Sequence, residues 1–433
     1  MSNPAHITAG GAPEGFDATL ILKELAKAKG PVLHIARDDK RAAAMAEALA
    51  FFDPSVPVLH FPGWDCLPYD RVSPNAEISA ARMATLAALA AGLSGGFVVL
   101  TTLNAASQYV PPRDLLRASA FVTKVGGQIN EARLREFLVR MGFVQTPTVT
   151  EPGDYSLRGG IIDVWPPGEA TPVRLDLFGD VLDGARRFDP MSQRTTEKLE
   201  QIELAPVSEI VLDEAAIRRF RQNYRIEFGA AGTDDPLYEA VSAGRKHQGV
   251  EHWLPFFHER LETLFDYLPK ATITCDDALT PARIARWESV ADQYETRKIA
   301  MGAKNRMDSV YKPAPAELLY LDEAAWDAAI SDRRVLQLAV LPQAVGLGTT
   351  DASGRIGRNF APERQQESIS LFGALAKHIK EKMEQGPVVI ASYSEGARER
   401  LSGLIEDEGL AETIALRDGK GIGKRGLYLA VWA

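Results

Sequence analysis

Residues 157–194 constrain the fold of this 433-residue chain more than any other segment. Gly159 and Gly160 favour a turn, the β-branched and aromatic residues among 161–165 favour a strand, and Pro-Pro-Gly at 166–168 ends that strand. A second strand is predicted at 172–178, and the Gly-Asp pair at 179–180 marks the next turn. Strands joined by such short connections predict a β-meander.

The second of these strands has two faces of different chemistry. Because successive side chains of a strand point to opposite faces, the Val and Leu residues at 173, 175 and 177 share one face. The other face carries Arg174, Asp176 and Phe178. If the Val/Leu face is buried, Phe178 stands outward between charges, which is unfavourable for an isolated domain but useful for docking a partner. The alternative is a sheet edge at which Phe178 is covered by a loop.

The N-terminal part of the chain alternates strands and helices. Strands are predicted at 30–36, 56–61 and 97–101, and helices at 41–52 and 77–91. The strand at 30–36 (GPVLHIA) is apolar along its length, as in a parallel sheet covered on both faces. Strand–helix–strand order therefore predicts an α/β fold with a parallel sheet.

Several boundaries divide the rest of the chain. A Gly-Gly pair at 126–127 precedes Asn130, which we expect to cap a helix at 131–141. After the meander, residues 213–341 are mixed, and a strand is predicted at 335–341. Residues 345–363 are rich in Gly, Thr, Ser and Arg and predict a linker. A helix at 365–384, a strand at 386–392 and a second helix to about 408 follow. The chain ends on an apolar strand, and we expect it to be a piece of a longer protein.

Charge and cysteine content exclude some classes of protein. The formal net charge is −9, whereas a protein that coats nucleic acid is usually basic. Cys66 and Cys275 lie far apart and predict neither a metal site nor a disulfide framework, which fits a reducing cytoplasm. No apolar run approaches the ~20 residues of a membrane-spanning helix, and we expect no contact with a membrane.

No catalytic motif is complete. The phosphate-binding pattern G-x-x-x-x-G-K-[ST] is absent, and GKGIGKRG at 419–426 has Arg425 where the hydroxyl residue should be. The acidic pair in LLYLDE at 318–323 favours a helix cap by Asp322 over a Mg²⁺ ligand, because no phosphate loop accompanies it. His252 and His258 lack the spacing of a helical metal pair. We therefore expect no catalytic residue, cofactor or metal in this chain.

One basic stripe is the candidate for weak contact with DNA. Arg218, Arg221 and Arg225 share a face of a predicted helix. The alternative is a solvated face whose charge is offset by neighbouring acids.

Four motifs carry a resemblance to a known family. They are FPGWDCLPYDRVSPNAEISAARMATL (61–86), PGDYSLRGG (152–160), RRFDPMSQRT (186–195) and GVEHWLPFFHE (249–259). Together they resemble the N-terminal region of the bacterial transcription-repair coupling factors. The meander also resembles the corresponding segment of the excinuclease protein UvrB, in the outline RG-x-x-x-D-h-x-P followed by V-R-h-x-x-F.

The resemblance implies a multidomain α/β organisation. Residues 1–125 would form an excinuclease-B-like domain 1A that is degenerate, because AGGAPEGFDATL (9–20) replaces the phosphate loop. Residues 126–212 would form an inserted β-rich domain 2, and 213–342 a mixed domain 1B with a strand returning to 1A. Residues 343–364 would be a linker, and 365–433 a small, truncated α/β domain 3. The damage-gripping hairpin of UvrB is missing, since eight residues (70–77) take its place.

The resemblance also implies a function and a site. Domain 2 of this family recruits the excinuclease protein UvrA, and the contact positions fall on Arg158, Arg174 and Phe178. Asp180 is added, although Gly179 departs from the more acidic family pattern. ATP, Mg²⁺, RNA polymerase and double-stranded DNA would be bound by a motor and other regions outside this chain. Two other readings remain: an excinuclease-B-like, ATP-dependent DNA-binding repair protein, and an unrelated α/β enzyme acting on a small molecule.

Overall fold

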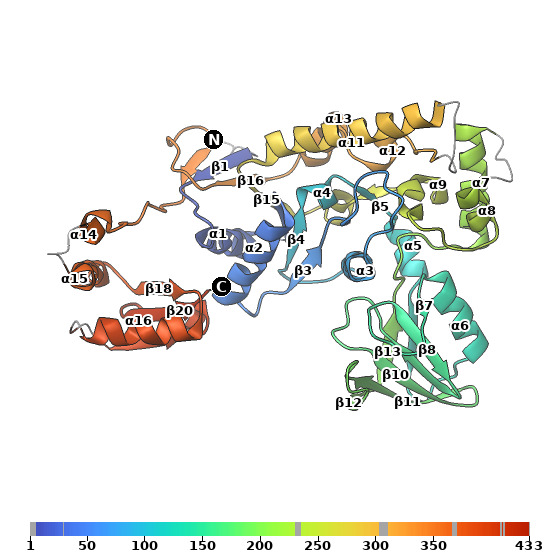
Figure 1. Ribbon diagram of the computed structural model, residues 1–433, viewed down its shortest axis with the longest axis horizontal. Helices are drawn as coiled ribbons and strands as arrows, with labels where there is room; N and C mark the ends of the chain where they lie inside the picture. Colours follow the sequence, from blue (N-terminus) through green and yellow to red (C-terminus); the bar gives the residue numbers. More distant parts are fainter. Residues whose placement is uncertain are drawn as a thin grey trace. The chain divides into compact units, whose positions relative to one another are not determined.

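The computed structural model describes residues 6–28, 30–229, 235–302, 311–365, 370–407, 409 and 412–432 (Figure 1). It is a multidomain α/β structure, and the predicted fold class is confirmed. The residues cluster into two compact units, one of residues 1–6, 28–42 and 58–336 and one of 7–27, 43–57 and 337–433. None of the described helices combines the length and apolar character that crossing a bilayer requires. The predicted five-segment division stays a prediction.

A parallel sheet forms the core of the first unit. Its strands run in the order β15 (Thr272–Asp276), β2 (Val32–Ala36), β4 (Val98–Thr102) and β3 (Val58–Phe61). Every residue of β2 and β4 is buried. For β2, the apolar sequence at 30–36 predicted this burial. Helix α3 (Ala76–Ala91) packs against β3, begins at its cap Asn75 and ends at Gly92 in the left-handed conformation.

A six-stranded sheet forms the β-rich domain, within the same unit. The strand order is β12 (Thr195–Leu199), β11 (Val181–Phe188), β10 (Val173–Phe178), β9 (Ile161–Val164), β8 (Asp154–Arg158) and β7 (Val144–Gln145). All pairs are antiparallel except β7 with β8. Helix α6 (Glu131–Arg140) supplies Leu134, Phe137 and Leu138 to the core beneath the sheet, and Asn130 caps it as predicted.

Helices and aromatic rings form the third core of the first unit. Helix α7 (Glu214–Phe228) is capped by Asp213, and α13 (Glu323–Ile330) by Asp322, as predicted for the latter. Phe220 of α7 stacks on Phe257 of α9 (Leu254–Phe257) with ring centroids 4.8 Å apart. The other elements of this region are α8 (Pro236–Ser242), η1 (Val250–Trp253), α11 (Leu279–Gly302) and α12 (Ala316–Leu319).

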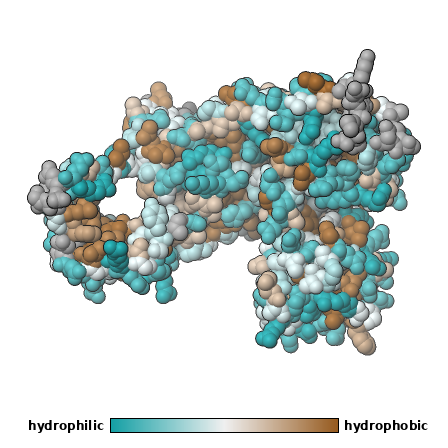
Figure 2. Space-filling view, in the orientation of Figure 1, coloured by the Kyte–Doolittle hydropathy of each residue, from teal (hydrophilic) through white to brown (hydrophobic). Residues whose placement is uncertain are grey.

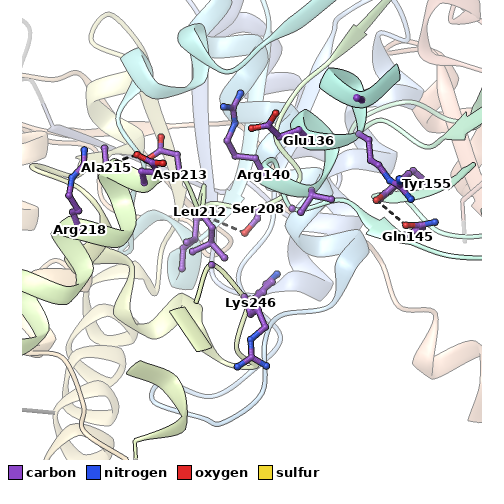
Figure 3. Close-up of a pocket in the computed structure, with 18 residues that line it drawn as sticks. Glu136, Arg140, Gln145, Tyr155, Ser208, Leu212, Asp213, Ala215, Arg218 and Lys246 are labelled. Carbon is purple, nitrogen blue, oxygen red and sulfur yellow. Dashed lines mark hydrogen bonds and ion pairs between the residues drawn. The ribbon is translucent and has the colours of Figure 1, made fainter. Parts of the chain in front are cut away.

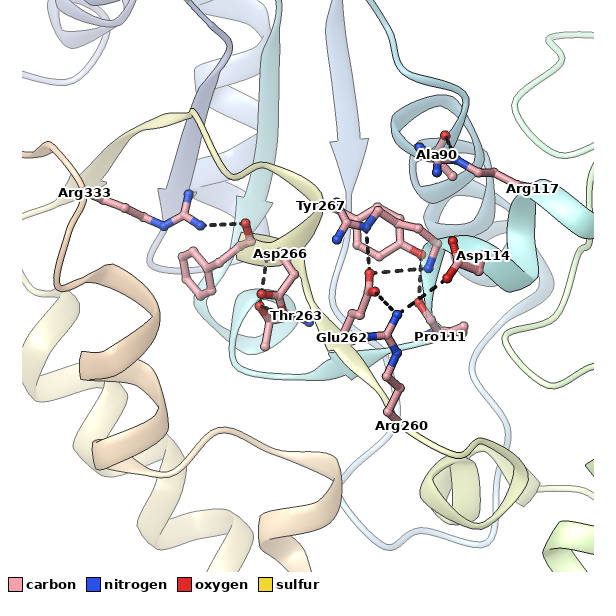
Figure 4. Close-up of polar contacts among 12 residues, drawn as sticks. Ala90, Pro111, Asp114, Arg117, Arg260, Glu262, Thr263, Asp266, Tyr267 and Arg333 are labelled. Atoms are coloured by element: carbon pink, nitrogen blue, oxygen red, sulfur yellow. Dashed lines mark hydrogen bonds and ion pairs between the residues drawn. The ribbon is translucent and has the colours of Figure 1, made fainter.

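A buried carboxylate ties two distant parts of the first unit together (Figure 4). Strand β14 (Glu262–Thr263) pairs with β5 (Tyr109–Val110), and Glu262 accepts from Nε of Arg113 at 2.9 Å. Arg260 lies 3.5 Å from the same carboxylate. The Tyr267 hydroxyl donates to the carbonyl of Pro111 at 2.7 Å. Connecting elements here are α4 (Leu103–Ala106), α5 (Arg113–Ala118), α10 (Leu264–Tyr267), and the antiparallel pair β6 (Phe121–Lys124) and β13 (Gln201–Leu204).

The second unit contains two strand systems. Strand β1 (His6–Gly10) pairs in parallel with β17 (Thr349–Asp351), and α1 (Phe16–Lys27) follows β1. The predicted linker therefore contains a short strand. A parallel sheet, β18 (Val388–Ser392), β20 (Leu427–Val431) and β19 (Thr413–Leu416), packs one face against α15 (Leu371–Met383) and α16 (Glu395–Asp407). Apolar side chains gather on the surface around α15 (Figure 2). This unit also contains α14 (Ala361–Gln365) and η2 (Gly419–Gly421), while α2 (Asp39–Phe52) and β16 (Val335–Ala339) have residues in both units.

Candidate partner-binding surface of the β-rich domain

Strand β10 presents its two faces as its sequence predicts. Val173 and Leu175 are buried against α6, whereas Arg174 and Asp176 are half-buried on the outer face. Phe178, at the end of the strand, exposes 81% of its surface. The interpretation in which a loop covers Phe178 is therefore wrong for this structure. An exposed phenylalanine of this kind marks a candidate binding surface.

Asp163 organises the arginines of this outer face. It lies opposite Arg174 in the β9–β10 register and is only 1% exposed. Its Oδ1 accepts from Nε of Arg174 at 2.7 Å, and its Oδ2 accepts from Nη2 of the same guanidinium at 2.9 Å. Nη2 of Arg158 donates to Oδ2 as well, at 2.9 Å. One buried carboxylate thus fixes both predicted contact arginines, one of them in bidentate geometry.

A further contact holds Arg174 in place. Its guanidinium lies 4.7 Å from the ring centroid of Phe188, and the hydrogen bonds that it donates to Asp163 raise the pKa of Arg174 above its usual value. Across the sheet, Arg174 faces Arg186 in register, and Arg186 in turn donates to Asp176 at 2.7 Å. Acids and arginines therefore alternate over the outer face, which limits repulsion between the like charges.

The end of the β10–β11 hairpin is apolar. Phe178 pairs in register with Val181, which is partly exposed, and Ile161 on β9 is exposed to a similar degree. Gly179 adopts a φ of 58° in the turn between the strands. Asp180 is exposed in this turn, and its carbonyl accepts from the amide of Ile129 at 2.8 Å. The surface thus combines an arginine pair with an apolar tip.

Asp163 was not among the predicted site residues. The sequence did contain one indication of its role, because Asp163 is the polar position in an otherwise apolar strand (IIDVW). The pairing with Arg174 depends on the β9–β10 register, which the strand sequences alone do not fix.

Comparison with known proteins bears on the same region. Residues 121–210 match the family described as the UvrB interaction domain. The transcription-repair-coupling factor of Escherichia coli is 31% identical over 96% of this chain and 35% of its own length. That of Haemophilus influenzae is 32% identical over 68% of this chain and 26% of its own length. That of Myxococcus xanthus is 35% identical over 60% of this chain and 23% of its own length.

The chain is homologous to the N-terminal region of the transcription-repair coupling factors. The predicted resemblance is confirmed, and the chain spans about a third of the length of the curated relatives it matches. The roles of Arg158, Arg174, Phe178 and Asp180 stay a prediction.

The counterpart of the phosphate loop in this coupling-factor chain follows β1. Gly11 and Gly15 have φ values of 73° and 91°, so the loop is as tightly turned as its glycines suggest. The carboxylate of Asp17 accepts from the amides of Gly15 at 3.0 Å and Ala18 at 2.9 Å. Backbone amides that could bind a phosphate are thus bonded to the chain's own carboxylate.

The segment after β16 covers the same loop. The amide of Gly354 donates to the carbonyl of Gly11 at 2.9 Å, and that of Ala352 donates to the carbonyl of Gly10 at 2.8 Å. A Cβ placed on Gly10 would lie 2.5 Å from the amide nitrogen of Gln343. The loop has neither the Lys nor the hydroxyl residue of a phosphate site, and its residues do not fit a bound triphosphate.

The described residues contain no arrangement that supports a metal site or a reactive cysteine. No group of three or more His, Cys, Asp or Glu side chains is placed to hold a metal ion in the described part of the chain. Burial lowers the pKa of His252 and of His258 to about 4. It also raises the pKa of the Cys66 and Cys275 thiols to about 12, which keeps both protonated and unreactive.

Proposed function

We propose that this chain is a non-catalytic N-terminal module of a transcription-repair coupling factor. Its β-rich domain would recruit the excinuclease protein UvrA to stalled RNA polymerase during transcription-coupled nucleotide excision repair of DNA. The observation that carries the proposal is Phe178, 81% exposed beside an arginine pair that a buried Asp163 holds in place. The match of residues 121–210 to the UvrB interaction domain supports the same surface.

The geometry suits a docking surface for physical reasons. An exposed aromatic side chain that becomes buried at the centre of an interface is a common hot spot. Guanidinium groups already fixed by Asp163 lose less side-chain entropy on binding than free arginines would. Arg158 remains about half exposed, so its remaining donors can bond to a partner's carboxylates. Asp180 lies in the turn beside Phe178 and would contact a donor of UvrA.

A binding assay with purified proteins tests this function. Tagged chain should retain purified UvrA, and Arg174→Ala or Phe178→Ala should each weaken binding by at least ~1 kcal/mol. Met191→Ala is the matched control, since Met191 is exposed in the same domain but outside the predicted contact set. Equal retention by all variants, or none by the wild type, would refute the proposal.

The proposed module has no catalytic role of its own. The Asp17 cap and the covering segment support a loop that binds no nucleotide. In the complete protein, ATP-driven translocation on double-stranded DNA and binding of RNA polymerase would belong to regions outside this chain. We also propose a cytoplasmic location, where DNA repair takes place in bacteria.

A further inference from the structure

A second surface of the first unit has a different chemistry from the docking face, which is the outer surface of the β-rich domain that carries Arg158, Arg174, Phe178 and Asp180. A cleft of about 1030 Å³ lies between α6 and the N-terminal turn of α7, with the loop after α8 along one side (Figure 3). In Figure 3, Arg218 and Asp213 lie on one side of the cleft and Gln145 with Tyr155 on the other, while Lys246 lies below. The volume is at the upper end of the range for ligand pockets, about 300–1,000 Å³. The cleft can therefore take several side chains of a bound peptide.

Basic side chains predominate around the cleft. Five of the lining residues are basic and three are acidic. Arg135, Arg140 and Arg245 are exposed and have no ion-pair partner among the described residues. Because the whole chain carries a formal net charge of −9, this excess of positive charge is local. A local excess of unpaired arginines favours an acidic ligand.

The acidic side chains of the cleft are partly engaged elsewhere. Asp213 accepts from the amide of Ala216 at 2.7 Å as the cap of α7. Glu214 lies 3.6 Å from Arg218, and both side chains are exposed, so this pair is weak. Glu136 stands on the exposed face of α6, four residues before Arg140. These acids would repel a continuous row of phosphates, but a peptide can place uncharged side chains beside them.

The walls of the cleft are apolar. Val139 of α6 is more than half exposed, and Ile210 and Leu212 also line the cleft. Tyr155 is the one aromatic ring among the described lining residues, and it is 1% exposed. Single-stranded nucleic acid is bound largely by stacking of bases on exposed aromatic rings, which this cleft does not offer. An amphipathic peptide would use both the apolar walls and the arginine rim.

We propose that this cleft binds an acidic, amphipathic peptide segment of a partner protein. The arginines at the rim bond to carboxylates of the segment, and its apolar side chains bury Val139 and Leu212. The proposal does not depend on recruitment of UvrA, because the two surfaces share none of the proposed contact residues.

Fluorescence anisotropy with the whole chain tests the proposal. The probe is a short labelled peptide of alternating Glu and Leu pairs, and a labelled oligothymidylate serves as the competing ligand. The double variant Arg140→Glu/Arg245→Glu should weaken peptide binding at least ~10-fold, equivalent to about 1.4 kcal/mol. Added salt should weaken wild-type binding as well.

Two variants serve as controls. Arg133→Glu makes the same single charge reversal as Arg140→Glu, on the same helix but outside the cleft, and a glutamate in the first turn of α6 interacts favourably with the helix dipole. Phe178→Ala alters the docking face only. Both should bind the peptide like the wild type, and all variants should melt alike. Absence of peptide binding, equal binding by the double variant, or tighter binding of the oligothymidylate would overturn the proposal.

Discussion

Asp163 is more deeply buried than Asp176, the other acid that bonds to an arginine on the docking face, and it has more arginine partners. It is almost fully buried and accepts from two arginines, while Asp176 is a quarter exposed and accepts from one. A carboxylate buried this deeply is stable only because both guanidinium groups surround it. Without it, Arg174 would face Arg186 across the strands with no acid on its other side.

Asp163→Asn should therefore impair both stability and docking. We expect the free energy of unfolding to fall by ~1–3 kcal/mol, because the arginines lose a charged acceptor in a buried position. Binding to UvrA should also weaken, since Arg158 and Arg174 are no longer held. Denaturant unfolding and calorimetric titration measure the two effects. Asp176→Asn is the matched control, and identical behaviour of the two variants in both measurements would contradict the role given to Asp163.

At the scale of residues, the sequence predicts correctly those positions that depend only on the alternation of side chains along one strand. It placed Arg174 and Phe178 on the outer face of β10, because only alternation along one strand was needed. It missed Asp163 because cross-strand pairing depends on the connection at 165–172, whose geometry the sequence does not specify.

At the scale of elements, apolar strands and capped helices could be predicted from the sequence, whereas short strands that form only by pairing with another strand could not. The apolar runs in β2 and β4 and the caps Asn130 and Asp322 carry their own local signals. Strand β17, by contrast, has three residues without an apolar pattern and exists through its pairing with β1. Residues 343–364 therefore looked like a linker, although part of the segment packs on the loop after β1.

That loop makes a prediction about nucleotide binding. Because Asp17 caps the amides and residues 343–354 cover them, saturating Mg-ATP should leave the melting temperature unchanged. A ligand that binds only the folded state raises its stability in proportion to the logarithm of its concentration. Differential scanning fluorimetry with Mg²⁺ alone as the control measures this effect. A concentration-dependent rise in melting temperature, or ATP turnover by the purified chain, would contradict a closed loop.

At the scale of the whole molecule, three histidines with lowered pKa values link stability to pH. Burial lowers the pKa of His34 to about 3 and those of His252 and His258 to about 4, against about 6.5 in an unfolded chain. The folded state keeps these imidazoles neutral, while the unfolded state binds protons below about pH 6.5. Their contribution is therefore complete above that pH and is lost as the pH falls towards 4.

The expected loss can be measured directly. Each histidine removes up to ~1.4 kcal/mol of unfolding free energy per pH unit in this window. His252→Phe should lower the slope of stability against pH, because His252 is fully buried between Trp64 and Tyr69 and a phenyl ring cannot take up a proton. Denaturant unfolding at several pH values between 7 and 5 gives both slopes. Parallel curves for variant and wild type would exclude this histidine as a source of the pH dependence.

The function proposed for the whole molecule depends on one exposed face of the β-rich domain binding UvrA. Calorimetric titration of UvrA into the chain, the Phe178→Ala variant and the Met191→Ala control measures this binding directly. We expect saturable binding by wild type and control, and a loss of at least ~1 kcal/mol for Phe178→Ala with an unchanged melting temperature. The same affinity for all three proteins, or no heat of binding from the wild type, would show that this face is not the docking site.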